Sequence, residues 1–415
     1  MACRKIDGPI TLVVAVILTT PGTVLAATDV WKKAVSGSFG DGTRWVDGTA
    51  PTAGDSAQFS AIGTYEALFD YDPVNQGLLL QGSGVDVTFY DDGGSRAYNL
   101  TAPGGTQDVE VIDGAALTLG MVGAPMRLSV GDELKVDTGG TLDVVEGSRA
   151  STVTLVVGTG GGGGGEVTVS GVDSRLTASG SDHYLGGGGS RGELVFDDSA
   201  TGDITGSLML GGKLTVNSEG ILTVESGATL SLEDLEAGTS GLSGQSGTVT
   251  VRGAGSQITQ TGASRLVLGD ASNSVGKLHV DSDGVFSTGT GRTTVAATGL
   301  IEINGGTFNA NGEVRIAGGT LTRSSLGTFA PAGGTTVTVS GGGMAKFEGD
   351  YVLDVPATIE VTGGGSELDT TGGVGITGEG QIDVTDNGLL CPPGALDVGT
   401  GDSNGTLTVS GGGDV

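Results

Sequence analysis

Acidic pairs are the first residues in this sequence that could do chemistry, because two neighbouring carboxylates can act as general acid and base or hold a cation. Asp91-Asp92 and Asp197-Asp198 are the only Asp-Asp pairs in the chain. Both stand beside Gly or Ser, in sequence that is typical of turns. We therefore expect solvated turns rather than a catalytic dyad, and the sequence assigns no catalytic residue.

Histidines and glycines give no stronger chemical signal. His183 and His279 are the only histidines, too few for a histidine-rich metal site and without the spacing of a zinc-binding helix. His279 alternates with Leu278 and Val280, which predicts an outward position on a strand. The six glycines 160–165 lack the Lys-Ser or Lys-Thr ending of a phosphate-binding loop, so we interpret them as a flexible corner.

Other motifs of metal or nucleophile chemistry are also missing from the sequence. It has no Gly-Gly-x-Gly-x-Asp array of a calcium-binding β-roll, although a turn such as Asp281-Ser-Asp-Gly284 could hold a cation weakly. No Gly-x-Ser-x-Gly elbow stands between a strand and a helix, because no amphipathic helix is evident. The sequence therefore predicts no metal site and no cofactor.

Cys3 and Cys391 are the only cysteines. Cys3 belongs to a segment that we expect to be removed, which leaves one thiol and no internal disulfide. Cys391 precedes two prolines, and we interpret it as a small inward-facing hydrophobe, with a reactive or intermolecular thiol as the alternative.

The composition indicates a folded protein that is rich in β-strands and turns. The 415 residues include 83 Gly, 10 Pro and 4% aromatic residues, and Val, Leu, Ile and Thr recur in short runs that suit strands. The formal net charge is -29, and the carboxylates are scattered without an acidic block. Such a charge disfavours nucleic acid and anionic membranes as partners, and it favours solubility over weak divalent-cation binding.

The N-terminus has the pattern of an export signal. Arg4 and Lys5 form a basic start, 10–19 an apolar run, and Val24-Leu25-Ala26 a small-residue cleavage box, so we expect a signal peptide over 1–26. An uncleaved anchor is the alternative. No later segment reaches the roughly 18 apolar residues that a membrane-spanning helix requires.

Beyond the signal, the aromatic residues separate two regions. Residues 27–100 hold both tryptophans, Trp31 and Trp45, and most of the tyrosines, which suits a cap at the open end of a repeat domain. Residues 101–415 repeat one phrase, an apolar-Thr-apolar strand followed by a polar-Gly turn. This pattern predicts a right-handed parallel β-helix, also called a β-solenoid, with an aromatic-containing N-terminal cap.

The repeat length can be estimated from the spacing of five matching apolar residues, Ile301, Val337, Ile359, Ile382 and Leu407. The last three steps are similar in length and suit one coil each. The first step is longer and passes over 313–317, which we expect to be an extra strand or a looped-out rung. At about 22 residues a coil, the part beyond residue 100 would make on the order of 14 rungs.

The repeat phrases carry a resemblance to a known class of proteins. Leu155-Val-Val-Gly158 with 166–177, and 248–259 with Leu266-Val-Leu-Gly269, resemble the repeat of bacterial autotransporter (type V secretion) passengers and PEP-CTERM-sorted surface proteins. Trp31, Trp45 and 50–59 resemble their opening module, with Phe39 where another tryptophan would stand. The resemblance implies a cell-surface, outer-membrane-associated or extracellular protein whose partners are surface or extracellular glycans or matrix.

The chain departs from this class at its C-terminal end. Neither a membrane β-barrel nor a Pro-Glu-Pro box with an apolar helix is present, and the sequence stops in mid-repeat at Val415. We therefore expect a solenoid that is truncated there and lacks its attachment module.

Three functions stay open on the sequence. The first is a non-catalytic, adhesin-like structural module. The second is a polysaccharide-active, pectin-lyase-like β-helix enzyme, which would need grouped Asp with Lys or Arg along one sheet. The third is a module that binds glycans without cleaving them.

Overall fold

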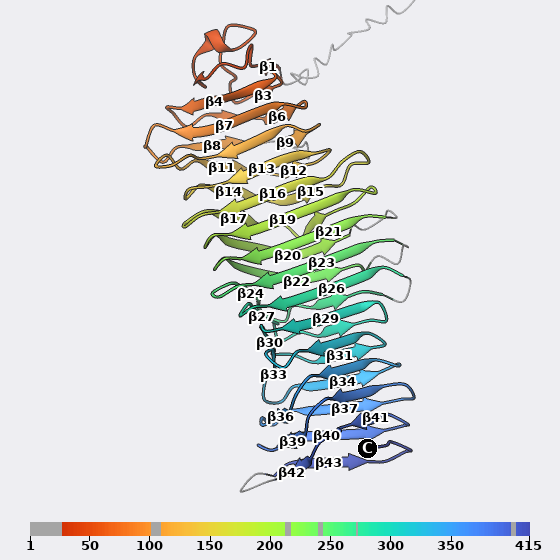
Figure 1. The fold of residues 1–415 in the computed structure, drawn as a ribbon. Coiled ribbons are helices and arrows are strands. Elements are labelled where there is room, and N and C mark those ends of the chain that lie inside the picture. Colours follow the sequence, from red (N-terminus) through yellow and green to blue (C-terminus); the bar gives the residue numbers. More distant parts are fainter. Residues whose placement is uncertain (1–26, 101–108, 212–216, 240–243, 271–272, 400–403) are drawn as a thin grey trace, which may run out of the picture.

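The computed structural model describes residues 27–100, 109–211, 217–239, 244–270, 273–399 and 404–415. Its strands stack in chain order along a rod, a parallel β-solenoid that runs from the N-terminal to the C-terminal end (Figure 1). Within these residues the only helix is the short 3-10 turn η1 (Gly42–Arg44), so no described helix could cross a membrane. The expected signal peptide, 1–26, and the start of the expected repeat region at Thr101 lie outside the described residues.

The first sheet contributes one strand to each turn of the solenoid. In the described part of the chain it has 15 strands. They are β2 (Gly37–Ser38), β4 (Gly63–Phe69), β7 (Val85–Asp91), β10 (Ala116–Leu119), β13 (Gly140–Val144), β16 (Gly165–Ser170), β19 (Arg191–Asp197), β21 (Glu219–Glu225), β23 (Ser246–Arg252), β26 (Val275–Asp281), β29 (Gly299–Asn304), β32 (Thr320–Arg323), β35 (Met344–Phe347), β38 (Glu367–Thr370) and β41 (Leu389–Cys391).

The second sheet holds 25 described strands and takes two strands from most turns. They are β1 (Thr28–Val30), β3 (Ser56–Phe59), β5 (Val74–Asn75), β6 (Gly77–Gln81), β8 (Ala97–Leu100), β9 (Val109–Ile112), β11 (Arg127–Val130), β12 (Glu133–Val136), β14 (Arg149–Thr152), β15 (Thr154–Val157), β17 (Arg175–Ala178), β18 (Asp182–Leu185), β20 (Thr201–Leu210), β22 (Thr229–Ala237), β24 (Gln257–Gln260), β25 (Leu266–Leu268), β27 (Val285–Ser287), β28 (Thr293–Val295), β30 (Thr307–Ala310), β31 (Val314–Ala317), β33 (Thr328–Pro331), β34 (Thr336–Ser340), β37 (Thr358–Thr362), β40 (Gln381–Thr385) and β43 (Thr406–Val409).

Stacking of apolar side chains explains why such short strands are stable. In β16, Val167 and Val169 are fully buried while Glu166 and Thr168 face outward. Val167 pairs in register with Leu142 of one neighbouring turn and with Leu194 of the other. Each turn therefore buries its apolar face inside the rod, in register with the turns beside it, as the alternating pattern of the sequence predicts.

The strand registers confirm part of the expected repeat and correct the rest. Val337, Ile359, Ile382 and Leu407 are successive partners in the second sheet, one turn apart. Ile301 pairs with Leu321 in the first sheet, so the longer step from Ile301 to Val337 joined two different sheets. Residues 313–317 are neither extra nor looped out, because they include β31, the regular neighbour of β34.

The turns also differ in length more than the sequence indicates. In the first sheet, the turn from Val249 to its partner Leu278 is much longer than the turn from Ile301 to its partner Leu321. A run of long turns lies in the middle of the rod, from β16 to β26. Three strands of the first sheet, β2, β4 and β7, come before residue 100, so the regular rungs begin within the region expected to be a cap.

An aromatic cluster fills the N-terminal end of the rod. Trp31 and Trp45 meet edge to face with ring centroids 5.1 Å apart, and the Trp45 Nε1–H donates a hydrogen bond to the Phe39 carbonyl oxygen at 2.9 Å. The region 27–100 that we expect to act as a cap shares both sheets with the later turns, since β7 pairs with β10 and β8 with β11. It therefore continues the ladder rather than forming a separate sheet.

The cross-section changes near the C-terminal end. There the second strand of each turn leaves the large sheet for a third one, whose described strands are β36 (Tyr351–Leu353), β39 (Val374–Ile376) and β42 (Leu396–Val398). Arg323 is half-buried at this junction, level with the buried Ile303 and Phe347 of the neighbouring strands. Its guanidinium donates to the carbonyl oxygens of Glu348 at 2.8 Å and Asp350 at 3.0 Å.

Candidate functional site

Each acidic pair lies where a strand of the first sheet ends and a turn begins, at Asp91 of β7 and Asp197 of β19. The expectation that both pairs are solvated is wrong for Asp91. Asp91 is buried, and its two carboxylate oxygens accept hydrogen bonds from the backbone N–H groups of Gly93 and Arg96, each at 2.7 Å. The Asp197 carboxylate accepts from the backbone N–H of Asp198, a residue with positive φ. Both pairs are therefore occupied in shaping turns.

His279 and Cys391 lie on the outer face of the first sheet. The outward position predicted for His279 is confirmed, and its Nδ1 is 2.9 Å from a Glu302 carboxylate oxygen. The inward position predicted for Cys391 is wrong, because Leu390 takes the buried place and Cys391 pairs with the outward Asp369. Partial burial, a hydrogen bond to Glu367 and nearby carboxylates raise the pKa of the Cys391 thiol to about 11.

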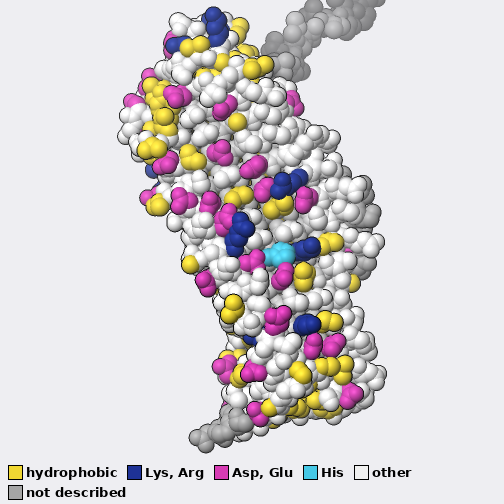
Figure 2. All heavy atoms as spheres, in the orientation of Figure 1, with side chains coloured by type: hydrophobic (Ala, Val, Ile, Leu, Met, Phe, Trp, Pro, Cys, Tyr) yellow, Lys and Arg dark blue, Asp and Glu magenta, His cyan; other side chains and the backbone are white. Residues whose placement is uncertain are grey.

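The glycine run and the Asp-Gly turn also lie at corners. Residues 160–164 connect β15 to β16, which begins at Gly165. Ser282 and Asp283 form a turn with positive φ after β26. Among the described residues, no three His, Cys, Asp or Glu side chains come together in a way that could hold a metal ion. Figure 2 shows acidic side chains scattered over the visible face of the rod, in keeping with their spread along the sequence.

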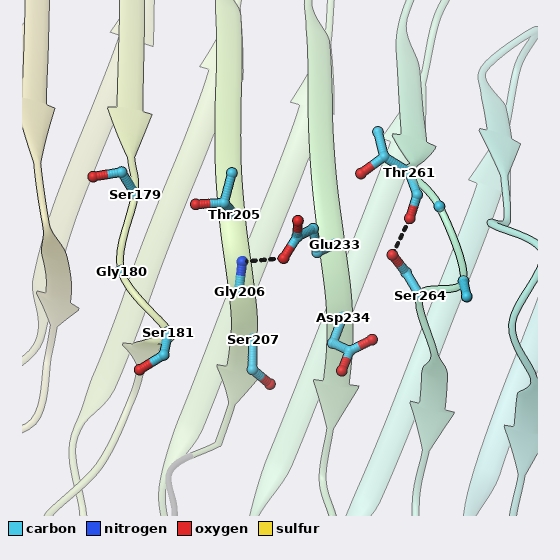
Figure 3. A pocket seen from close by; sticks show the side chains of 12 residues that line it. Ser179, Gly180, Ser181, Thr205, Gly206, Ser207, Glu233, Asp234, Thr261 and Ser264 are labelled. Atoms are coloured by element: carbon cyan, nitrogen blue, oxygen red, sulfur yellow. Dashed lines mark hydrogen bonds between the residues drawn. The ribbon is translucent and has the colours of Figure 1, made fainter.

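A polar hollow follows a corner of the second sheet, in the middle of the rod. We call it the corner groove, an open hollow of about 690 Å³ that crosses four successive turns. Two rows of side chains line it along the rod axis (Figure 3). The first row is Ser179, Thr205, Glu233 and Thr261. The second row is Ser181, Ser207, Asp234 and Ser264. Within it Ser207 and Asp234 are register partners, and the partner of Ser207 on the preceding turn is Asp182. The Ser264 hydroxyl is buried and donates to the Thr261 carbonyl oxygen.

A glycine bend in β20 opens the corner. The register of β20 against β22 shifts between Ile204 and Ser207, and Gly206 has a φ of +80°. A Cβ atom at Gly206 would lie 2.3 Å from the Gly180 carbonyl oxygen, so only glycine fits here. The Gly206 N–H donates to the Glu233 carboxylate at 2.6 Å, which holds that side chain at the groove.

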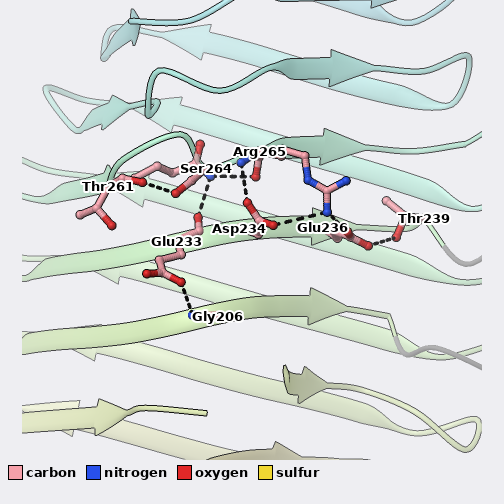
Figure 4. A network of polar contacts seen from close by, with 9 residues as sticks. Gly206, Glu233, Asp234, Glu236, Thr239, Thr261, Ser264 and Arg265 are labelled. Carbon is pink, nitrogen blue, oxygen red and sulfur yellow. Dashed lines mark hydrogen bonds and ion pairs between the residues drawn. The ribbon is translucent and has the colours of Figure 1, made fainter. Parts of the chain in front are cut away.

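Arg265 borders the groove and neutralises part of its negative charge. Its backbone N–H donates to the Asp234 carboxylate at 2.6 Å. Its guanidinium lies 3.3 Å from Asp234 and 3.4 Å from Glu236, and Figure 4 shows it reaching across both carboxylates. The Arg265 side chain is 57% exposed, so it adds more to the charge pattern of the surface than to stability.

Beside the second row runs a parallel row that is partly apolar. Tyr184 pairs with Met209, and Met209 with Glu236, all facing outward on β18, β20 and β22. Glu236 in turn pairs with Val267 of β25. We call Tyr184, Met209, Glu236 and Val267 the outer row. It sets an aromatic ring and a thioether next to the hydroxyl and carboxyl groups of the groove.

His183 lies directly beneath this surface and is fully buried. Its Nδ1 accepts a hydrogen bond from the Leu155 backbone N–H at 3.1 Å, and its Nε2 lies 2.8 Å from the Thr205 carbonyl oxygen. The ring is therefore a neutral Nε2–H tautomer that links two turns. Burial lowers the pKa of His183, against hydrogen bonds to Thr205 and Gly180 and the charge of Asp182, which raise it.

The sequence does not identify this site. Its residues span 179–264 and are mostly Ser, Thr and Gly, which occur everywhere in the chain. One usable signal is the recurrence of glycine at the corner, since Gly206 and Gly262 follow Gly180 after one turn and after three.

Comparisons with known proteins leave the family open. No family model matches the sequence, and no curated protein matches it. Among solved structures, the chain is similar to the crystal structure of the hyper-glycosylated fragment 55–350 of TibA, whose glycosylation TibC catalysed. The identity is 16% and the TM-score 0.30, over 91% of this chain and 100% of that one. A likeness of this size leaves the function to be argued from the residues.

Proposed function

We propose that this chain is an exported, non-catalytic stalk that displays long polar faces at the cell surface or outside the cell, in an adhesin-like or matrix role. The observation that carries the proposal is the unbroken ladder of the first sheet from β2 to β41. In such a rod each added turn lengthens the exposed surface without enlarging a globular core. The export pattern of 1–26 supports the same localisation, at the cell surface or outside the cell.

The repeat phrases support this role as well. The stretches 155–177 and 248–269, which contain the phrases that resemble passengers of type V secretion and PEP-CTERM surface proteins, form turns of the ladder in the middle of the rod. On this proposal the partners are extracellular glycans or matrix. The net charge of -29 argues against nucleic acid.

A deletion strain of the source bacterium tests the proposal. Loss of the gene should reduce attachment of cells to a glycan-coated surface, and a plasmid copy should restore it. Unchanged attachment would contradict the adhesin-like role.

The rival function is a polysaccharide-active β-helix enzyme. The observation that favours it is the open groove in which the Glu233 and Asp234 carboxylates stand next to each other. Incubation of the purified chain with acidic and neutral polysaccharides should yield no new reducing ends and no unsaturated products. Either product would overturn the non-catalytic proposal.

A further inference from the structure

We infer that the corner groove and its outer row bind one strand of a linear, uncharged polysaccharide that lies parallel to the rod axis. This inference deepens the proposed function, because it names the ligand class and the site. It begins from the geometry of the groove, which repeats the same kind of polar position on four successive turns.

The repeat distance suits a chain of sugars. Neighbouring parallel strands are about 4.8 Å apart, so the polar side chains of successive turns recur at that interval along the axis. One pyranose unit of an extended polysaccharide has a similar length. A linear glycan in the groove would therefore meet polar groups of a new turn at each sugar, over about four sugars.

The polar groups suit hydroxyl recognition. Sugar hydroxyls both donate and accept, and they need partners of both kinds. The carboxylates of Glu233 and Asp234 are strong acceptors, while Ser207 supplies a hydroxyl that can do either. Glu233 and Asp234 are each fixed by a backbone N–H at 2.6 Å, so little side-chain freedom is lost when a ligand binds.

The outer row supplies the apolar part of the site. Tyr184 and Met209 lie side by side on adjacent strands and are partly exposed. The C–H face of a pyranose ring can pack on such a surface while its hydroxyls reach the neighbouring row. Ligand sites commonly join an apolar platform to a few fixed polar groups in this way.

The charges decide between classes of glycan. Four carboxylates, those of Asp182, Glu233, Asp234 and Glu236, stand in the groove or in the rows beside it, against the single guanidinium of Arg265. This excess of negative charge repels uronic-acid and sulfated chains. It leaves uncharged polysaccharides as the class that the groove fits.

Calorimetric titration of the purified mature chain with neutral oligosaccharides of defined length tests the inference. The probes are cello-, manno- and N-acetylated chito-oligosaccharides of about two to six units, with oligogalacturonates as the charged arm. We expect at least one neutral series to bind, with a Kd that falls with length up to about four units and then levels off. Oligogalacturonates of equal length should bind at least about tenfold more weakly.

Three variants locate the site. Tyr184→Ala and Asp234→Asn should each raise the Kd about tenfold, because each removes one recognition group. Asn keeps an acceptor for the Arg265 N–H, so the fold should hold, and equal melting temperatures check this. Glu302→Gln, a carboxylate change on the first sheet, should leave the Kd unchanged.

Three outcomes would overturn the inference: no binding of any neutral series at millimolar concentration, tighter binding of oligogalacturonates, or equal affinity in all three variants. Binding by the purified chain together with unchanged attachment of the deletion strain would overturn the proposed function and leave the site standing. Loss of attachment without binding by the purified chain would overturn the inference about the groove and leave the proposed function standing.

Discussion

The N-terminal turns and the middle turns fill the same solenoid interior in different ways. The N-terminal end packs aromatic rings, with Trp31, Trp45, Phe39, Phe59 and Phe69 all fully buried. The middle turns, from β13 to β26, are filled mainly by Leu, Val and Ile, with some Ala and with Phe196 as an aromatic residue. An end turn has a neighbour on one side only, so it must bury more area by itself, whereas a middle turn is covered on both sides.

This difference teaches where the chain can accept irregular structure. Long turns occur in both regions, since Val87 and its partner Leu117 are at least as far apart in the chain as Val249 and its partner Leu278. The bend of β20 and the corner groove, however, are in the middle. The middle turns, packed by smaller aliphatic side chains, are therefore where a strand bends and presents polar side chains.

The largest expected effect follows from removing the aromatic anchor of the end. Trp45→Ala should cost about 3–5 kcal/mol of unfolding free energy, since it leaves a cavity between Trp31 and Phe39. Leu222→Ala in β21 is the matched change in the middle. Hydrogen exchange should show lost protection confined to β1–β4 in the first variant. Equal loss in β19–β23 would contradict the comparison.

A second prediction concerns the junction near the C-terminal end, where the cross-section changes. Arg323→Met keeps the apolar stem but removes the bonds to the carbonyl oxygens of Glu348 and Asp350, at an expected cost of about 1.5–3 kcal/mol. Chemical denaturation measures this cost. Arg315→Met, on an exposed position of β31, is the control and should change little. Equal costs would mean that Arg323 does not hold the junction.

A third prediction is a pH dependence of the middle turns. Because the pKa of His183 is lowered in the folded state, the unfolded chain binds the proton more readily, and stability is lost as pH falls through about 6.5. Protonation adds a hydrogen to Nδ1, which then faces the Leu155 N–H and can no longer accept its hydrogen bond. The expected cost is about 1–3 kcal/mol. Unfolding by urea at pH 7.5 and 5 measures the difference.

The control variants for this titration are His183→Leu and His279→Gln. The first should lose the pH dependence, since a leucine stacks on Leu155 and Leu208 without titrating. The second should keep it, because His279 lies on the outer face. A pH dependence that survives in His183→Leu would assign it to other groups.

The smallest expected effect is that of an exposed ion pair. Arg292 and Glu313 are 2.9 Å apart on the surface, with side chains 54% and 42% exposed. A double-mutant cycle to alanine should give a coupling of about 0.2–1 kcal/mol that fades with added salt. A coupling free energy as large as the cost of Arg323→Met would mean that this exposed ion pair stabilises the rod as much as the contacts of Arg323 at the junction.

Much of the architecture could be predicted from alternation and repeat length. The stack of Val337, Ile359, Ile382 and Leu407 follows directly from their spacing. The assignment of Ile301 failed because the same apolar-Thr-apolar phrase occurs in both sheets, so spacing alone cannot tell one sheet from the other. The expectation of an inward Cys391 is wrong because the period of two along β41 gives the buried place to Leu390.

The candidate site could not be predicted in the same way. Its residues come from four turns, and only the register shift at Gly206 brings their corners into one hollow. The role of His183 was also hidden, because its partners Leu155 and Thr205 belong to the turns on either side and are far from it in the sequence. Registers between turns, rather than motifs, create this surface.

Labelling of intact cells tests the central claim, an exported display rod, most directly. A membrane-impermeant amine reagent should modify the exposed Lys32 and Lys346 on whole cells as fully as in lysed cells. Mass spectrometry of the labelled chain should find it beginning at Ala27. Modification that requires lysis, on a chain that retains residues 1–26, would contradict the account.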